Sequence, residues 1–133
     1  MDRTRNINDI RHERGQTTTE FAIVLPIIAL LLFGVIQFGI LFNNYVTITD
    51  AVRAGARKAA VSRQSGNPVG ACVGAVRASA GSLDQSRLGV TCSSTWARAS
   101  DVTVTATFPY EINLLGLVLA SGQLNSTTTE RVE

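Results

Sequence analysis

Apolar and polar positions divide the chain into one long apolar run and a mixed remainder. The run from Phe21 to Phe42 carries no formal charge. At about 1.5 Å rise per residue, a helix of this run is roughly 33 Å long, enough to cross the roughly 30 Å hydrocarbon core of a bilayer. The run therefore predicts a membrane-spanning helix, and Pro26, which has no N–H to donate, predicts a bend within it.

Helical spacing continues beyond the apolar run, over residues 43–61. Apolar side chains recur there at spacings of three and four, while Arg53 and Arg57 lie on the opposite side. The apolar positions are Tyr45, Ile48, Val52, Ala56 and Ala59. This amphipathic segment either packs on a partner or carries a domain of its own chain, and the second interpretation is favoured.

The remainder predicts a small α+β domain. Residues 62–70 contain glycine and proline and end the long helix, and residues 71–86 keep helical spacing, which predicts a short second helix. A strand is expected over 88–95, and strict alternation of apolar and polar residues predicts another over 101–110. A last strand over 123–132 is expected to pair with the strand at 101–110.

The apolar run Ile112–Ala120 is too short to cross a bilayer. It is either a short helix that caps the sheet or a loop that touches the membrane surface or a partner, and its length favours the helix. The predicted fold class is thus α+β, with a long N-terminal transmembrane helix that extends into a small head containing a short antiparallel sheet.

Basic residues beside the apolar run predict its orientation. Arg11 and Arg14 precede the run, and the next basic residue beyond it is Arg53. Because basic residues near a span favour the cytoplasmic side, the N-terminus is expected in the cytoplasm and the head outside it. A cleaved secretory signal peptide is the alternative, but its apolar region is normally roughly 7 to 15 residues long, so a retained helix is favoured.

Two cysteines, Cys72 and Cys92, lie in the predicted head. Outside the cytoplasm they meet oxidising conditions, which favour a disulfide between them. Closing a loop of about 20 residues is worth on the order of 3 kcal/mol in the chain-entropy model. The alternative is two free buried thiols.

Charge and residue chemistry exclude several classes of function. The formal net charge is only +2 and the basic residues are scattered, unlike the basic patches of nucleic-acid-binding proteins. The single histidine, His12, is far in sequence from Cys72 and Cys92, so no metal site or catalytic nucleophile is predicted. No cofactor is expected, and no catalytic motif indicates an enzyme.

The junction before the apolar run carries a family resemblance. It has the sequence R-G-Q-T-T-T-E-F from Arg14 to Phe21, with Gly15 after a basic residue and Glu20 just before the first aromatic residue. This pattern resembles the cleavage site of type IV pilin precursors. Together with A-V-R-A-G-A-R-K-A-A-V over residues 51–61, it is similar to the TadE-like minor pseudopilins of tight-adherence (Tad, Flp-type) pilus systems.

The resemblance implies that a membrane prepilin peptidase cuts the precursor after Gly15 and leaves Gln16 as the new N-terminus. By the same resemblance, Glu20 and Phe21 belong to the helix through which pilin-like subunits assemble. The expected role is structural and not catalytic.

With this resemblance, the chain is expected to divide into three parts. They are a cytoplasmic leader (1–15), a transmembrane and amphipathic helix (16–62) and a small pilin-like extracytoplasmic head (63–133). The implied partners are the bacterial inner membrane, the prepilin peptidase, other pilins or pseudopilins (TadF-like or Flp pilin) and the Tad secretion platform. The protein would assist assembly of a pilus used in adhesion and surface attachment, either remaining in the membrane or entering the pilus.

Two alternatives stay open. One is a major pilin-like filament subunit, although such subunits are usually much shorter past the helix. The other is a single-pass membrane-anchored protein with an unrelated function outside the cytoplasm.

Glu20 is also unusual on physical grounds. A carboxylate at the edge of a hydrocarbon span is costly unless it is paired or held at headgroup level, and its penalty reaches roughly 2.5 to 3.5 kcal/mol at a helix centre. After cleavage, the nearest cation is the α-amine of a neighbouring subunit in a helical bundle, which predicts a charge pair that sets the register between subunits. The alternative is a carboxylate that extends to the membrane interface and does nothing more.

Overall fold

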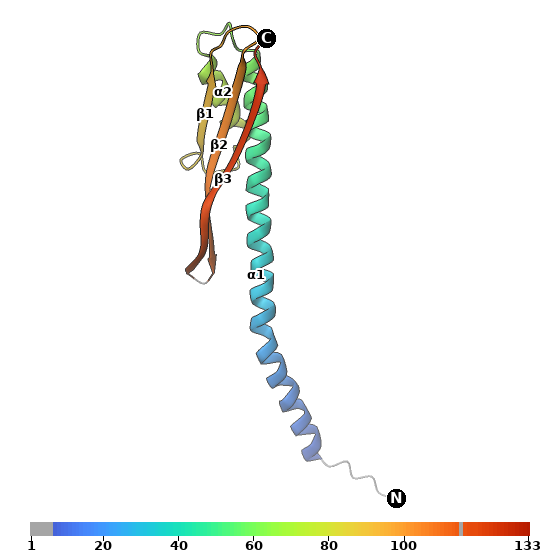
Figure 1. Cartoon of the computed structure of the whole chain (residues 1–133). Coiled ribbons are helices and arrows are strands. Elements are labelled where there is room, and N and C mark those ends of the chain that lie inside the picture. Colours follow the sequence, from blue (N-terminus) through green and yellow to red (C-terminus); the bar gives the residue numbers. More distant parts are fainter. Residues whose placement is uncertain (1–6, 115) are drawn as a thin grey trace, which may run out of the picture. The chain divides into compact units, whose positions relative to one another are not determined.

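The structure, a computed structural model, describes the backbone of residues 7–114 and 116–133 and the side chains of 16–114 and 116–133. The chain divides into two compact units, Met1–Phe38 and Gly39–Glu133, called here the helical unit and the head unit. The elements shown in Figure 1 are α1 (Ile7–Ala60), α2 (Pro68–Ser79), β1 (Gly89–Ser94), β2 (Asp101–Leu114) and β3 (Leu117–Arg131). The predicted class, a long N-terminal helix followed by a small α+β head, is confirmed.

In the helical unit, the apolar side chains of α1 are uncovered. The large apolar residues from Phe21 to Phe38 range from 37% exposed at Phe33 to 70% at Val35. The helix continues through Pro26. Within the described chain, Gln16–Ala60 is long and apolar enough to cross a membrane, which is compatible with a single-pass membrane protein.

In the head unit, α1 buries one face and exposes the other. Arg53 and Arg57 are exposed, and Arg53 lies 3.6 Å from Asp50 in an ion pair that water surrounds. The buried positions are Ile48, Ala51, Val52, Ala56 and Ala59. Tyr45, expected in this stripe, is exposed. The buried stripe joins the core of the same chain, as the favoured interpretation of the amphipathic segment predicts.

The helix predicted over 71–86 is present, but it lies earlier in the chain, at Pro68–Ser79. Its start is set by Asn67, whose side-chain oxygen accepts a hydrogen bond from the N–H of Gly70 at 2.8 Å. Pro68 suits the first helical position, because its missing N–H would have had no helical partner there. Local capping therefore decides where α2 begins.

After Ser79 the chain turns instead of continuing as a helix. The side-chain amide of Gln85 donates to the carbonyl of Ala80 at 2.7 Å, which satisfies a carbonyl at the helix end. The Asp84 carboxylate accepts hydrogen bonds from the hydroxyl and the N–H of Ser86, and these bonds lower the pKa of Asp84. A lowered pKa stabilises the fold above the unfolded-state pKa, and this contribution is lost as the pH falls through the folded-state pKa.

The three strands form an antiparallel sheet in the order β1-β2-β3. The alternating residues of β2 separate as predicted, with an apolar face buried in the core and threonines on the other face. The buried residues are Val102, Val104, Ala106 and Phe108. On the polar face, the hydroxyl oxygens of Thr105 and Thr127 lie 3.0 Å apart across β2 and β3. The predicted pairing of the last strand with β2 is therefore confirmed.

Ile112–Ala120 forms a β-hairpin, so the expected short helix is wrong. β2 and β3 stay paired as far as Leu114 and Leu117. Between them Gly116 has a φ of +89°, a left-handed conformation that glycine adopts without steric cost. The periodicity of a short apolar run does not distinguish a strand from a helix, and here pairing with β3 decides the outcome.

The core is tightest where α1 passes α2 and β2, at Gly55. A Cβ atom at this position would overlap Cγ2 of Val76, and it would lie 3.4 Å from the carbonyl oxygen of Cys72 and 3.6 Å from Cγ1 of Val104. All three neighbours are fully buried. The missing side chain of Gly55 therefore allows one helix to contact both the second helix and the sheet.

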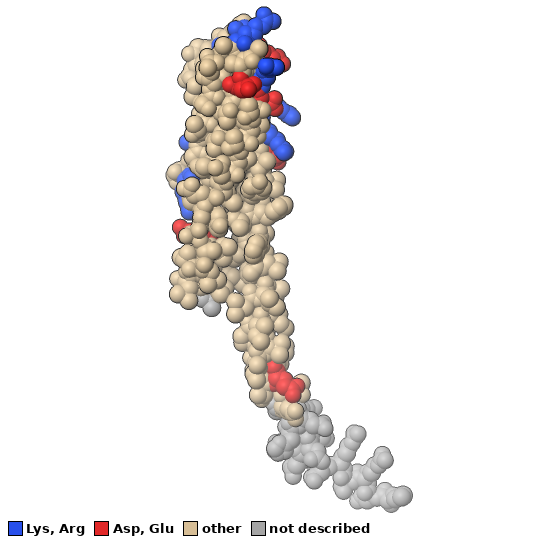
Figure 2. Space-filling model, viewed as in Figure 1, with Lys and Arg blue, Asp and Glu red and all other residues tan. Residues whose placement is uncertain are grey.

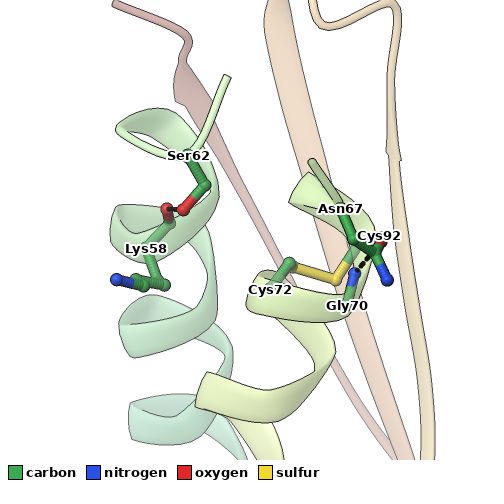
Figure 3. The surroundings of a disulfide bond; sticks show 6 residues. All are labelled: Lys58, Ser62, Asn67, Gly70, Cys72 and Cys92. Atoms are coloured by element: carbon green, nitrogen blue, oxygen red, sulfur yellow. Dashed lines mark hydrogen bonds between the residues drawn. A yellow bond between two sulfur atoms is a disulfide. The ribbon is translucent and has the colours of Figure 1, made fainter. Parts of the chain in front are cut away.

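Cys72 on α2 and Cys92 on β1 form a disulfide, shown in Figure 3. The predicted bridge is confirmed, and the alternative of two free thiols is wrong, since both cysteines of the chain are bonded to each other. The bridge joins the short helix to an edge strand across a sequence separation of 20 residues.

The end of the chain returns to the end of α1. The N–H of Glu133 donates to the carbonyl of Ala60 at 3.1 Å, and the N–H of Val132 donates to the carbonyl of Ser100 at 2.8 Å. Because Ser100 directly precedes β2, these bonds place the start of β2 beside the C-terminal end of α1. β2 then runs toward the opposite end of the head unit, as Figure 1 shows.

We expect Gly55→Leu to destabilise the head by about 2 kcal/mol, because the added side chain enters a space already filled by Val76 and Val104. Urea unfolding of the full chain in detergent micelles, followed by fluorescence of the single tryptophan, Trp96, measures this change. Gly74→Ala is the matched control. Its added Cβ meets nothing within 4 Å, so the same assay should show equal or higher stability. Equal unfolding midpoints for both variants would contradict the packing role of Gly55.

Replacing both cysteines by serine should lower the free energy of unfolding by about 3 kcal/mol, because the unfolded chain regains the freedom of the closed loop. The same Trp96 assay measures the loss. Wild type treated with reductant serves as the control, since it should approach the stability of the double variant. An unfolding midpoint unchanged in both would show that the bridge contributes nothing to stability.

Candidate assembly segment

The predicted junction residues lie on one exposed stretch of the helical unit. Gly15 and Gln16 are both within α1, and Gln16 through Phe21 are exposed. In a helix interior, glycine is roughly 1 kcal/mol less favourable than alanine. Gly15 therefore lowers the local stability of the helix at the predicted cleavage position.

Glu20 is the one charged residue between Gln16 and Thr49. Its Oε1 atom accepts a hydrogen bond from Nε2 of Gln16 at 3.3 Å, one helical turn away. The glutamine amide is neutral, so this contact leaves the charge of Glu20 uncompensated. The carboxylate is exposed and adjacent to Phe21, where a cation of another molecule could reach it.

From Phe21 to Phe42, α1 carries no charge and presents apolar residues on every side. The consecutive residues Leu30, Leu31 and Leu32 point in different directions around the helix axis, and all three are exposed. A helix that is apolar all round requires an apolar environment on every side, which a bilayer or a bundle of similar helices provides. The segment can therefore serve as an anchor and as an assembly surface.

The head unit has an open hollow of about 390 Å³. It is lined by Val61, Arg63, Gln64, Arg98 and Glu133. Nε of Arg63 donates to the backbone carbonyl of Glu133 at 3.1 Å. This guanidinium therefore holds the last residue of the chain in place. Among the described residues, no group of three or more histidine, cysteine, aspartate or glutamate side chains could hold a metal ion. The features described for α1 make it the stronger candidate for function.

These features define a class of protein, namely one apolar helix of membrane-spanning length followed by a small disulfide-bridged α+β head. A model of the TadE-like protein family matches residues 15–57. The predicted resemblance to TadE-like proteins is confirmed over these residues. Searches of curated proteins and of solved structures found no significant match to either.

The matched segment covers two different kinds of surface. Its first part contains the junction and the exposed apolar helix, and its second part contains the buried stripe of the head. Gly55 belongs to that second part, although sequence analysis did not identify it as important. The available signal was its place between Val52 and Ala59, since a glycine in the apolar stripe of a helix often marks close packing.

Proposed function

We propose that this protein is a minor pseudopilin that assists assembly of a Tad pilus used in adhesion and surface attachment. The observation that carries this proposal is the TadE-like match over residues 15–57. It coincides with the junction, the exposed apolar helix and the part of α1 that holds the head. The role is structural, and its partners are other pilins or pseudopilins, the prepilin peptidase and the Tad secretion platform.

In this proposal α1 crosses the inner membrane once, with the N-terminus in the cytoplasm and the head outside it. Arg11 and Arg14 before the apolar run, and the lack of basic residues from there to Arg53, support this orientation. The Cys72–Cys92 disulfide also supports it, because such bonds persist in oxidising compartments.

The size of the head favours a minor subunit over a major pilin. Beyond α1, the chain forms a second helix and a three-stranded sheet around a common core. Major pilins of these systems are usually much shorter past the helix. A disulfide-bridged head of this kind suits a subunit that caps or primes a filament.

Glu20 is proposed to pair with the α-amine of a neighbouring processed subunit. Among the residues whose side chains the structure describes, the carboxylate contacts the neutral amide of Gln16, which does not compensate its charge. In an apolar helical bundle an unpaired carboxylate is costly, and a paired one fixes the register of neighbouring helices.

Cleavage after Gly15 is expected to remove the leader in cells that contain an active prepilin peptidase. The intact mass of the purified protein should then correspond to a chain beginning at Gln16. Gly15→Leu should retain the leader, because a bulky side chain replaces the small residue at the cleaved bond. Gly34→Ala is the control, since an added Cβ there meets nothing within 4 Å and processing should continue. An unprocessed wild-type chain in such cells would refute the pilin-type leader.

Glu20→Ala should leave cleavage intact and reduce incorporation into the pilin assembly by about tenfold or more, equivalent to about 1.4 kcal/mol. Co-purification with epitope-tagged pilins, quantified against the membrane-bound amount, measures this loss. Asp50→Ala is the matched control, because it removes a carboxylate from an exposed position on the same helix and should assemble normally. Normal incorporation of the Glu20→Ala chain would rule out the proposed charge pair.

A further inference from the structure

The β2–β3 hairpin extends well past the rest of the sheet. β1 pairs with β2 no further than Thr107, which lies opposite Gly89. From Phe108 onward, β2 and β3 continue alone as a two-stranded ribbon. The end of this ribbon, Leu114–Ala120, is called here the hairpin tip.

The hairpin tip is apolar in sequence and contains no charged residue, and its residues 116–120 are exposed. Leu117, Val118 and Leu119 are 71%, 58% and 63% exposed. No charged residue occurs between Glu111 and Glu130. In Figure 2 charged side chains gather over the rest of the head unit, while the surface at the end of the ribbon carries none. Exposed apolar side chains that cluster in this way mark a contact with lipid or with another protein.

The last charges before the hairpin tip lie near the middle of the ribbon. Arg87 forms an ion pair with Glu111 at 3.9 Å, and its guanidinium lies 5.7 Å from the ring centre of Phe108. One residue nearer the base, the ring of Tyr110 lies against Gly122 on the facing strand, 2.9 Å from the position of a Cβ there. Aromatic residues therefore lie at the base of the ribbon, the ion pair lies near its middle, and only uncharged residues follow beyond it.

The tip also lies at the end of the head unit where the apolar run of α1 finishes. Val104 on β2 lies beside Gly55 on α1. Lengths along the two elements can therefore be measured from this shared point. Leu114 is roughly 33 Å further along β2 at about 3.3 Å per residue. Phe42 is roughly 20 Å from Gly55 along α1 at about 1.5 Å per residue. Figure 1 shows the closed end of the β2–β3 hairpin at the end of the head unit opposite the C-terminus.

We propose that the hairpin tip inserts into the headgroup–acyl boundary of the bilayer from which Phe42 emerges. Lipid is favoured over a protein partner because the tip reaches at least as far as Phe42, the last residue of the apolar run. The free N–H and C=O groups at the edges of a two-stranded ribbon have no partners in hydrocarbon, so insertion is limited to the apolar residues beyond the Arg87–Glu111 ion pair. The tip is thus a second membrane contact, which restrains the head on the membrane surface.

Depth-dependent fluorescence quenching tests this proposal on the full chain in vesicles of phosphatidylcholine and phosphatidylglycerol. Leu119→Cys provides a labelling site for an environment-sensitive fluorophore, because both native cysteines are bonded to each other. Nitroxide-bearing lipids should quench this label at least twofold more than a label at the control position, Thr91→Cys on β1. Aqueous iodide should give the opposite order. Val118→Cys provides a second labelled position at the tip, and unchanged Trp96 emission verifies that each variant folds.

Two results would overturn the proposal. If iodide quenches the tip labels as fully as the Thr91 label, the tip lies in water. If neither quencher reaches the tip labels, protein covers the tip, either a second copy or another region of the chain. The proposal requires α1 to cross the bilayer, but it does not depend on the pilus role. These vesicles contain no peptidase and no pilins, so its outcome is independent of the Gly15 and Glu20 experiments.

Discussion

The close approach of α1 to α2 and β2 at Gly55 is the contact on which the head depends. A core built from one three-stranded sheet and one short helix has few large side chains to bury, so it needs close packing of small ones. Gly55 and the alanines beside it allow the helix to approach the sheet closely. The Cys72–Cys92 bridge then ties α2 to the strand farthest from β3. Stability of the head thus comes from close packing and one covalent link, with little contribution from surface ion pairs.

A single helix, α1, serves two environments because its pattern of polar residues changes along its length. From Phe21 to Phe42 it carries no formal charge and is apolar on every side, which suits lipid or a helical bundle. From Ile48 the apolar residues narrow to a stripe that the head buries, and Asp50 and Arg53 appear on the solvent side. The TadE-like match covers both parts. The same helix therefore contributes both to the segment proposed to assemble with other subunits and to the core of the head.

Most of the candidate assembly segment could be predicted from sequence because its features are local. Gly15, Glu20 and Phe21 are close in the chain, and a carboxylate beside an apolar run is visible without any tertiary structure. The hydrogen bond between Gln16 and Glu20 follows from their spacing of four residues on one helix. The hairpin tip was different, because its surface exists only once two strands have paired beyond the end of β1.

The amino-acid sequence by itself determined the long helix, the change from an all-apolar to a one-sided surface, and the alternating faces of β2. These features depend on periods of 3.6 and 2 residues that any short window reveals. Tertiary structure alone decided that Ile112–Ala120 forms a hairpin, because its backbone bonds come from strand pairing. It also decided that position 55 must lack a side chain, since the residue that would clash, Val76, lies on another helix. Both features depend on contacts between residues that are far apart in the sequence. Such contacts leave no periodic pattern in the sequence around either residue, so they are seen only in the folded chain.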